Sequence, residues 1–241
     1  MFGGITALED VSFAVSPGSI TGVIGPNGAG KTTLFNIITG IYTQTSGHVY
    51  LDNKPITGFP PERLAPLGMV RTFQNIELFS QMTVLENVMV GLHTGSKSGI
   101  LSCVLKLPGH LREERAIRER AQHWLDFVGL GDAASIVAGN LPFGKGRLLE
   151  IARALAIEPR IILMDEPAAG LNSRETAELA QLIRRIRESG ITIVLVEHDM
   201  ELVMDICDAI LVLNLGRLLA AGTPREIQEN QAVVDAYLGE G

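Results

Sequence analysis

The spacing of hydrophobic and polar residues changes along the chain, and each spacing predicts a different kind of structure. Residues 2–19 alternate between apolar and polar, so we expect antiparallel strands there. Between residues 84 and 155 this pattern gives way to apolar residues at helical spacing, which predicts a helical segment. Beyond residue 161, short and nearly continuous apolar runs are typical of parallel strands covered on both faces. The sequence therefore predicts an α/β domain with a helical segment inserted in it.

Individual runs predict the elements more closely. We expect strands at 20–24, 69–72, 161–164, 191–196 and 209–213, and a hairpin over 48–56. We expect helices at 33–39, shortly after Pro60 and Pro61, and at 84–91, 111–128, 146–155 and 173–189. In the helix at 111–128 the apolar residues form one stripe, which indicates that a single face of this helix is buried. The stripe consists of Ile117, Ala121, Trp124, Leu125 and Val128.

A glycine-rich loop follows the apolar run at 20–24 and precedes the first helix. It contains the complete phosphate-loop pattern G-x-x-x-x-G-K-T and consists of Gly25, Pro26, Asn27, Gly28, Ala29, Gly30, Lys31, Thr32 and Thr33. Because its glycines lack a Cβ, the backbone can take positive φ angles and turn successive N–H groups toward an anion, with help from the helix dipole. Lys31 would reach the β and γ phosphates, and the Thr32 hydroxyl would ligate Mg²⁺. The loop predicts a site for a nucleoside triphosphate.

Two adjacent carboxylates follow the apolar run at 161–164. An acid at a buried strand end holds Mg²⁺ through water in phosphate-loop enzymes, and Asp165 fits this role. Glu166 points the other way at the strand end, where it can accept a proton from an attacking water. We therefore assign Asp165 to the metal and Glu166 to catalysis as the general base.

Composition narrows the class of protein. The chain has 241 residues and is 46% hydrophobic, which suffices for one large domain with a buried core. No apolar run approaches the roughly 18 residues that span a bilayer, and no signal-peptide pattern opens the chain, so we expect a cytoplasmic protein. The net charge of −7 argues against nucleic acid as a partner. Cys103 and Cys207 show no metal spacing, and we expect both to be small core residues.

These residues together resemble one family, the ATP-binding cassette (ABC) ATPases that drive ABC transporters, and the resemblance covers essentially the whole chain. In that family a glutamine follows the strand after the first lobe, where this chain has Gln74, and a histidine ends a later strand, where it has His198. The resemblance implies that Gln74 senses Mg²⁺ and the attacking water, that His198 contacts the γ phosphate, and that Phe2 stacks on adenine. It also implies ATP and Mg²⁺ as cofactors and ATP hydrolysis as the reaction.

The family's signature segment, Leu-Ser-Gly-Gly-Gln, opens a helix and contacts the ATP of the other subunit in a dimer. Its place is occupied by Leu141, Pro142, Phe143, Gly144 and Lys145. Pro142 is a departure, because it offers neither the serine hydroxyl nor a backbone N–H, whereas Gly144 keeps its N–H. The resemblance implies that the segment binds ATP in trans, and the departure predicts slower hydrolysis at the site that it completes.

Other stretches resemble the ATPase subunits of branched-chain amino acid importers, namely 2–4, 71–74, 166–172, 197–200 with 202–204, and 236–239. The fold that this implies is a RecA-like phosphate-loop core with an antiparallel β lobe and an inserted α-helical subdomain. Within a single domain, 1–241, the core and β lobe would comprise 1–75 and 156–241, and the helical subdomain would comprise 76–155.

The resemblance implies that the chain drives import through separate transmembrane permease subunits, at the cytoplasmic face of the cell membrane. It also implies a companion ABC ATPase, in a heterodimer or homodimer, and an indirect extracytoplasmic solute-binding protein. Leucine, other amino acids, amides and urea stay open as solutes. The alternative functions are a soluble cassette ATPase of DNA repair or translation and an ATP-dependent clamp with little turnover. The intact Lys31, Asp165, Glu166 and His198 argue against the clamp.

Overall fold

The computed structural model describes residues 6–72, 77–93 and 108–238, and the chain divides into two compact units. The first, which we call the core unit, comprises Met1–Gln74 and Arg160–Gly241. The second, the helical unit, comprises Asn75–Pro159. Each unit is described separately below.

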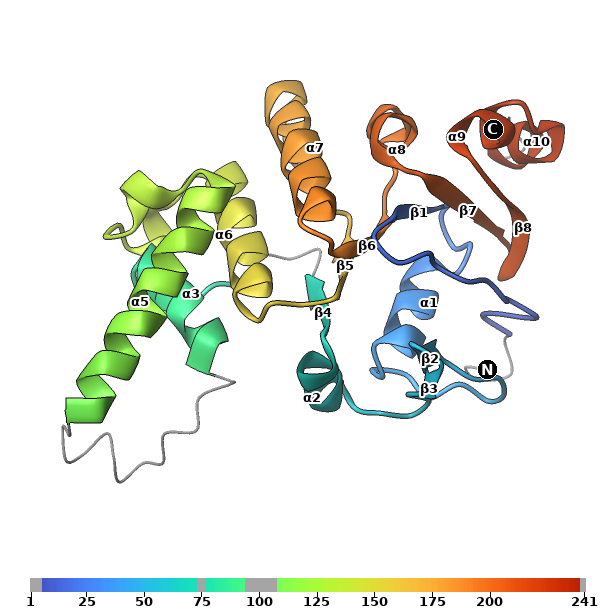
Figure 1. The fold of residues 1–241 in the computed structure, drawn as a ribbon. Coiled ribbons are helices and arrows are strands. Elements are labelled where there is room, and N and C mark those ends of the chain that lie inside the picture. The colour runs from blue at the N-terminus through green and yellow to red at the C-terminus, as the bar shows by residue number, and fades with distance from the viewer. Residues whose placement is uncertain (1–5, 73–76, 94–107, 239–241) are drawn as a thin grey trace. The chain divides into compact units, whose positions relative to one another are not determined.

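A six-stranded sheet forms the centre of the core unit (Figure 1). Its strand order is β4-β5-β6-β1-β7-β8, in which neighbours from β4 to β7 are parallel and β8 is antiparallel to β7. The strands are β1 (Ile20–Ile24), β4 (Met69–Thr72), β5 (Ile161–Asp165), β6 (Thr192–Val196), β7 (Ala209–Asn214) and β8 (Arg217–Gly222). Parallel strands end at the same edge of a sheet, so the loops that follow β1, β5 and β6 lie along one edge.

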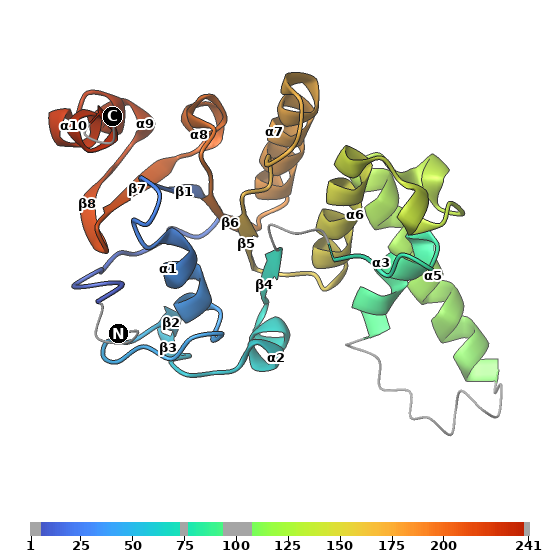
Figure 2. The same ribbon diagram turned by 180° about the vertical axis from the view of Figure 1, so that it is seen from behind.

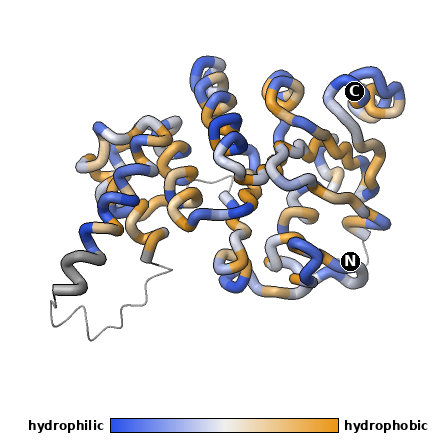
Figure 3. The backbone as a smooth tube through the Cα atoms, in the orientation of Figure 1, coloured by the Kyte–Doolittle hydropathy of each residue, from blue (hydrophilic) through white to orange (hydrophobic). Residues whose placement is uncertain are grey.

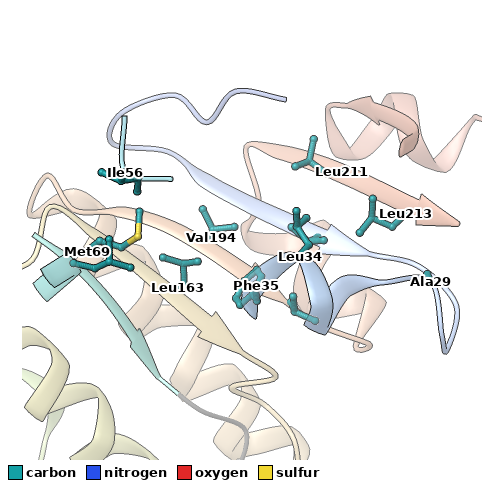
Figure 4. Close-up of a cluster of buried hydrophobic side chains, with 12 residues drawn as sticks. Ala29, Leu34, Phe35, Ile56, Met69, Leu163, Val194, Leu211 and Leu213 are labelled. Carbon is teal, nitrogen blue, oxygen red and sulfur yellow. The ribbon is translucent and has the colours of Figure 1, made fainter. Parts of the chain in front are cut away.

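Helices cover both faces of this sheet, which explains why its central strands are almost continuously apolar. Helix α1 (Lys31–Ile38) lies on one face, and α7 (Ser173–Glu188) and α8 (Met200–Ile206) lie on the other (Figures 1 and 2). On the α1 face, Leu34 and Phe35 pack into a buried cluster with strand residues such as Val194 (Figure 4). This packing fixes the start of α1, and with it the phosphate loop, against the sheet.

Smaller elements complete the core unit. A two-stranded hairpin pairs β2 (Tyr50–Leu51) with β3 (Lys54–Pro55), and the turn residues Asp52 and Asn53 both have positive φ. It is followed by α2 (Pro61–Leu64) and the 3-10 turn η1 (Ala65–Leu67). Two helices, α9 (Pro224–Gln228) and α10 (Gln231–Leu238), follow β8.

In the described part of the helical unit, three helices pack around a small apolar core. They are α3 (Val84–His93), α5 (Pro108–Val128) and α6 (Phe143–Ala156), and the 3-10 turns η2 (Gly131–Ala133) and η3 (Ala138–Asn140) connect the last two. On α5 the predicted stripe is confirmed: Ile117, Ala121, Leu125 and Val128 are buried and Trp124 is partly buried. Mixed hydropathy along α5 and α7 in Figure 3 corresponds to this one-sided burial.

The predicted strands and helices are confirmed with bounds shifted by a few residues, but one prediction is wrong. Residues 6–19, the described part of the stretch expected to form antiparallel strands, contain no strand. Their apolar residues do pack against the core cluster, as Leu8 and Phe13 show, so the alternation reports one-sided burial rather than pairing of the backbone. Asp10 interrupts the extended chain with a φ of 52°.

Candidate active site

The phosphate loop joins β1 to α1 and has the backbone conformation that its glycines predict. The φ angles of Gly25, Gly28 and Gly30 are 147°, 76° and 101°. At Gly25 the requirement for glycine is also steric, because a Cβ there would lie 2.0 Å from the carbonyl oxygen of Leu213 on β7. Gly30 is the N-cap of α1, so the first turn of the helix begins directly behind the loop. Free N–H groups of a first helical turn attract anions such as phosphate.

Lys31 lies buried in the first turn of α1, and its amine is hydrogen-bonded within the phosphate loop. Its Nζ donates to the carbonyl oxygens of Gly25 at 2.5 Å and Pro26 at 2.9 Å. Thr32, the next residue, is exposed. A cation and a hydroxyl therefore begin the helix at the mouth of the loop, which is the chemistry that binds phosphate and Mg²⁺.

Asp165 ends β5, two strands away from β1, and its side chain is only 8% exposed. The register pairs Asp165 with Val196 and Val196 with Val23, so the last residues of β5 and β6 form one row across the sheet with the next-to-last residue of β1. Oδ2 of Asp165 accepts from Nη2 of Arg71 at 2.6 Å. The carboxylate is thus buried and paired at the edge of the sheet where the phosphate loop begins.

Glu166 and His198 meet at this same edge. Oε1 of Glu166 lies 2.7 Å from Nε2 of His198, which follows β6. Glu166 has a φ of 48°, an unfavourable conformation for a residue with a side chain, and its N–H donates to the carbonyl of Val196 at 2.9 Å. The side chain of Glu166 is 17% exposed and that of His198 is 45% exposed, so the pair is accessible. The arrangement provides a carboxylate whose orientation is set by an imidazole.

Glu197 precedes His198 and supports this pair from inside the protein. It is only 3% exposed. Its Oε1 accepts from the N–H of Ala168 at 2.7 Å, and its Oε2 accepts from the N–H of His198 at 3.1 Å. Burial raises the pKa of Glu197, and the negative charge of Glu166 adds to this, although backbone N–H donors act in the opposite direction. The buried carboxylate of Glu197 therefore links the backbone of the loop after Glu166 to the backbone of His198, whose side chain contacts Glu166.

The site's donor groups fit a nucleoside triphosphate with Mg²⁺. Mg²⁺ prefers oxygen ligands and usually takes one or two protein groups together with phosphates and water. Thr32 and Asp165 are oxygen donors at the phosphate loop and at the end of β5, respectively. These two residues would hold the ion.

The signature-like segment lies in the helical unit at the start of α6. Pro142 is the N-cap, and the helix begins at Phe143, three residues earlier than the sequence predicts, so Gly144 and Lys145 belong to its first turn. Phe143 is 53% exposed, and the buried Arg147 lies with its guanidinium carbon 6.0 Å from the centre of that ring. The segment presents a helix N-terminus and an exposed aromatic ring.

Two predicted site residues lie outside the described residues, namely Gln74 and Phe2. The structure also brings Arg71 and Glu197 to the site, and the sequence alone predicts no role for either residue. Both carried a signal, because each is a charged residue in or directly after an apolar strand, where a charge requires a partner.

The chain is similar in sequence to known proteins. Residues 8–169 match the ABC transporter family, and residues 217–241 match the family described as branched-chain amino acid ATP-binding cassette transporter. The chain is 48% identical, over 99% of its own length and 94% of the relative's, to the high-affinity branched-chain amino acid transport ATP-binding protein BraF of Pseudomonas aeruginosa. It is 47% identical over the same shares to the corresponding protein LivG of Escherichia coli.

Solved structures resemble the chain over nearly all of its length. An ATP-binding cassette of an ABC transporter in its ADP conformation gives a TM-score of 0.86 at 36% identity, covering 99% of this chain and 94% of that one. A nucleotide-free cassette from an ABC transporter gives 0.85 at 35% identity, covering 98% and 94%. A dimeric bacterial ABC transporter cassette gives 0.76 at 30% identity, covering 93% and 94%. No helix in the described parts of the chain is long and apolar enough to cross a membrane.

Proposed function

The chain belongs to the ABC transporter family of ATP-binding cassettes, and from this we propose that it is the ATP-hydrolysing subunit of an importer for branched-chain amino acids. Membership confirms the resemblance, the ABC ATPase fold and the class of enzyme predicted from the sequence. The alternative of an ATP-dependent clamp with little turnover is not favoured, because the similar proteins are named as transport subunits.

One observation in the structure carries the catalytic part of this proposal. The ends of β5 and β6 bring Glu166 and His198 to 2.7 Å, at the sheet edge where β1 leads into the phosphate loop. A base must lie within hydrogen-bond reach of the water that it activates, and its orientation must be controlled. Glu166 meets the second condition through His198, and its 17% exposure leaves it open to water.

In the proposed mechanism each residue acts on a defined part of Mg²⁺-ATP. The loop from Gly25 to Thr33 binds the phosphates through backbone N–H groups, and Lys31 exchanges its loop carbonyls for β and γ phosphate oxygens. Thr32 and Asp165 would hold Mg²⁺, and a bound Mg²⁺ would supply positive charge against the phosphates. Glu166 takes the proton of the attacking water, and His198 orients Glu166 and reaches the γ phosphate.

The remaining assignments are also proposals. Gln74 would sense Mg²⁺ and the water, and Phe2 would stack on adenine. In a dimer the segment from Leu141 to Lys145 would complete the partner's ATP site through the first turn of α6. We assign 1–75 and 156–241 to the core with its β lobe, and 76–155 to the helical subdomain, within one ABC ATPase domain.

The partners follow from the kind of complex in which such a subunit works. Transmembrane permease subunits would provide the path, a companion or identical ATPase would form the dimer, and a solute-binding protein would deliver the solute outside. The chain would act at the cytoplasmic face of the membrane. Branched-chain amino acids are the best-supported solute because BraF and LivG are named for that transport.

The test is to copurify the chain with its permease subunits, reconstitute the complex in vesicles with the binding protein, and measure ATP hydrolysis. We expect leucine, isoleucine or valine to stimulate hydrolysis, and the variant Glu166→Gln to abolish it. Stimulation by urea or an amide alone would contradict the solute assignment. Permease copurification without ATP hydrolysis under any condition would contradict the enzymatic assignment.

A further inference from the structure

Arg71 connects three parts of the core unit through one buried guanidinium. It lies on β4, and its Nη2 donates to Oδ2 of Asp165 on β5 at 2.6 Å. Its Nη1 donates to Oδ1 of Asn36 at 2.7 Å and to Oγ1 of Thr39 at 3.1 Å, at the C-terminal end of α1. The same group lies 5.6 Å from the ring centre of Phe35. Arg71 thus links Asp165 to the helix whose first turn carries Lys31 and Thr32.

The burial of this ion pair restricts how Asp165 can be oriented. The side chains of Arg71 and Asp165 are 7% and 8% exposed. If Asp165 rotated away, a buried charge would lose its partner, which is strongly unfavourable in a protein interior. Arg71 cannot easily follow such a rotation, because Asn36 and Thr39 hold its other nitrogen. The carboxylate is therefore fixed relative to α1.

Given the proposed function, on which this inference rests, we propose that Arg71 is a positioning residue for the Mg²⁺ site. It binds Oδ2 of Asp165 and so presents the carboxylate to Mg²⁺ in one orientation, at a position coupled to α1 and hence to Thr32. Groups that orient metal ligands commonly change metal affinity or activity by 10- to 100-fold when they are removed. In this role Arg71 would act through Asp165 and not by contacting ATP or the metal itself.

The geometry requires arginine rather than a positive charge alone. A guanidinium is planar and offers donors in a rigid fork, so it can bind Asp165 with one nitrogen and two α1 side chains with the other. A lysine amine is a single point charge on a flexible stem. Arg71→Lys therefore keeps the charge and loses the fixed geometry, which makes it the informative variant.

The experiment measures how strongly Mg²⁺ increases the affinity for nucleotide. A fluorescent ATP analogue is titrated onto the purified chain in Mg²⁺ and again in EDTA, and the ratio of the two dissociation constants gives the Mg²⁺ enhancement. We expect Arg71→Lys to reduce this ratio by about tenfold. We expect its affinity in EDTA to change by less than about twofold, because the phosphate loop is intact.

Arg160→Lys is the matched control. Arg160 directly precedes β5, at the opposite end from Asp165, and forms an exposed ion pair with Asp52. We expect its Mg²⁺ enhancement to equal that of the wild type. Equal Mg²⁺ enhancement in Arg71→Lys and the wild type would overturn the proposal. An equal loss of nucleotide affinity with and without Mg²⁺ would also overturn it, because such a loss indicates a general structural effect of the substitution.

A double-mutant cycle tests whether Arg71 acts through Asp165. Asp165→Asn should also reduce the Mg²⁺ enhancement, and adding Arg71→Lys should reduce it no further. Effects that multiply would overturn the proposal. A wild-type chain that binds no ATP would instead overturn the proposed function, and this proposal with it.

Asn36→Ala keeps the inference testable if circular dichroism shows that Arg71→Lys is unfolded. This variant removes one acceptor of Arg71 and leaves the pair with Asp165 in place. We expect a smaller reduction of the same ratio. An unchanged ratio in a folded Asn36→Ala protein would then overturn the proposal.

Discussion

Replacing Glu197 by glutamine should reduce both stability and turnover, because this carboxylate holds two backbone segments of the site. Its oxygens accept from Ala168 at 2.7 Å and from His198 at 3.1 Å. A glutamine has one oxygen and one NH₂ group, so one of the two N–H groups would face a donor and lose its partner. A buried unsatisfied group costs about 1–3 kcal/mol, and removing the buried charge offsets part of this. We expect the free energy of unfolding at pH 7 to fall by roughly 1–3 kcal/mol.

The effect on catalysis should exceed the effect on binding. The loop after Glu166 and the backbone at His198 would no longer be tied together, so the 2.7 Å contact between these side chains would loosen. Misplacement by about 1 Å can reduce turnover by roughly 10². We expect kcat to fall by this order, while the affinity for ATP at the phosphate loop changes by less than about twofold.

The assays are urea unfolding, nucleotide titration and steady-state hydrolysis, with Glu178→Gln as the matched control. Glu178 lies on α7 in an exposed pair with Arg174, and such pairs contribute about 0.3–0.5 kcal/mol. If Glu197→Gln matched Glu178→Gln in both stability and kcat, the bridging role of Glu197 would be refuted.

The pH dependence gives a separate check on the same residue. Burial raises the pKa of Glu197 above its ordinary value of 4.5, so the folded protein binds this proton more tightly than the unfolded chain. The resulting stabilisation is complete below the ordinary value and is lost as the pH rises through the raised one. The wild type should therefore gain stability relative to Glu197→Gln as the pH falls from 7 toward 4.5. A difference that stays constant over this range would contradict the assignment.

Four further predictions concern the loop, the base and the signature-like segment. Lys31→Ala should weaken ATP binding by at least about tenfold, since a charge-assisted contact contributes about 1.5–3 kcal/mol. Lys54→Ala, at an exposed position, should leave ATP binding unchanged, and fluorescent-nucleotide titration of both variants tests this. Glu166→Gln should keep ATP bound and lower kcat by at least about 100-fold, and wild-type hydrolysis would move the base elsewhere, with His198 the next candidate. Gly25→Ala should lose ATP binding because its Cβ would meet the Leu213 carbonyl at 2.0 Å, whereas Gly28→Ala, with nothing within 4 Å, should suffer only the strain of a positive φ; equal affinities would contradict the steric argument. The double variant Pro142→Ser, Lys145→Gln should raise ATP hydrolysis by a homodimer. No gain would mean that the first turn of α6 is sufficient to complete the partner's ATP site without the serine and the glutamine.

The phosphate loop and the central strands could be predicted because their signals are local. The run from Ile20 to Ile24 is apolar at every position but two, and all of it is buried in the structure. A short run of this kind favours a strand that is covered on both faces. The loop's glycines have their positive φ angles for reasons visible in the motif itself. The end of β5 at Asp165 follows from the first charged residue after an apolar run.

The stretch before β1 shows where local patterns are insufficient. Alternation predicts which side of an extended chain is buried, and the packing of Leu8 and Phe13 against the core confirms this. A strand also needs a neighbour for its backbone, and nothing in the local pattern reports one. Glu9, for example, donates from its backbone to Gly216, which is more than 200 residues away in sequence, without forming a ladder. The sequence does not predict the antiparallel edge strand β8 either, because this strand depends on its pairing with β7.

The roles of Arg71 and Glu197 depend on strand order, which explains why the sequence indicates that they need partners but does not identify them. Arg71 meets Asp165 across 94 positions because β4 pairs with β5, and Glu197 meets Ala168 because β5 pairs with β6. Each contact lies next to a residue that we assign to chemistry, Asp165 in one case and Glu166 in the other. The exposure of the side chains increases outward from this support, from 8% at Asp165 to 17% at Glu166 and 45% at His198. At this end of β5 and β6, the side chain held by a buried ion pair is therefore that of Asp165, and the more accessible side chains are those of Glu166 and His198, which we propose meet water and phosphate.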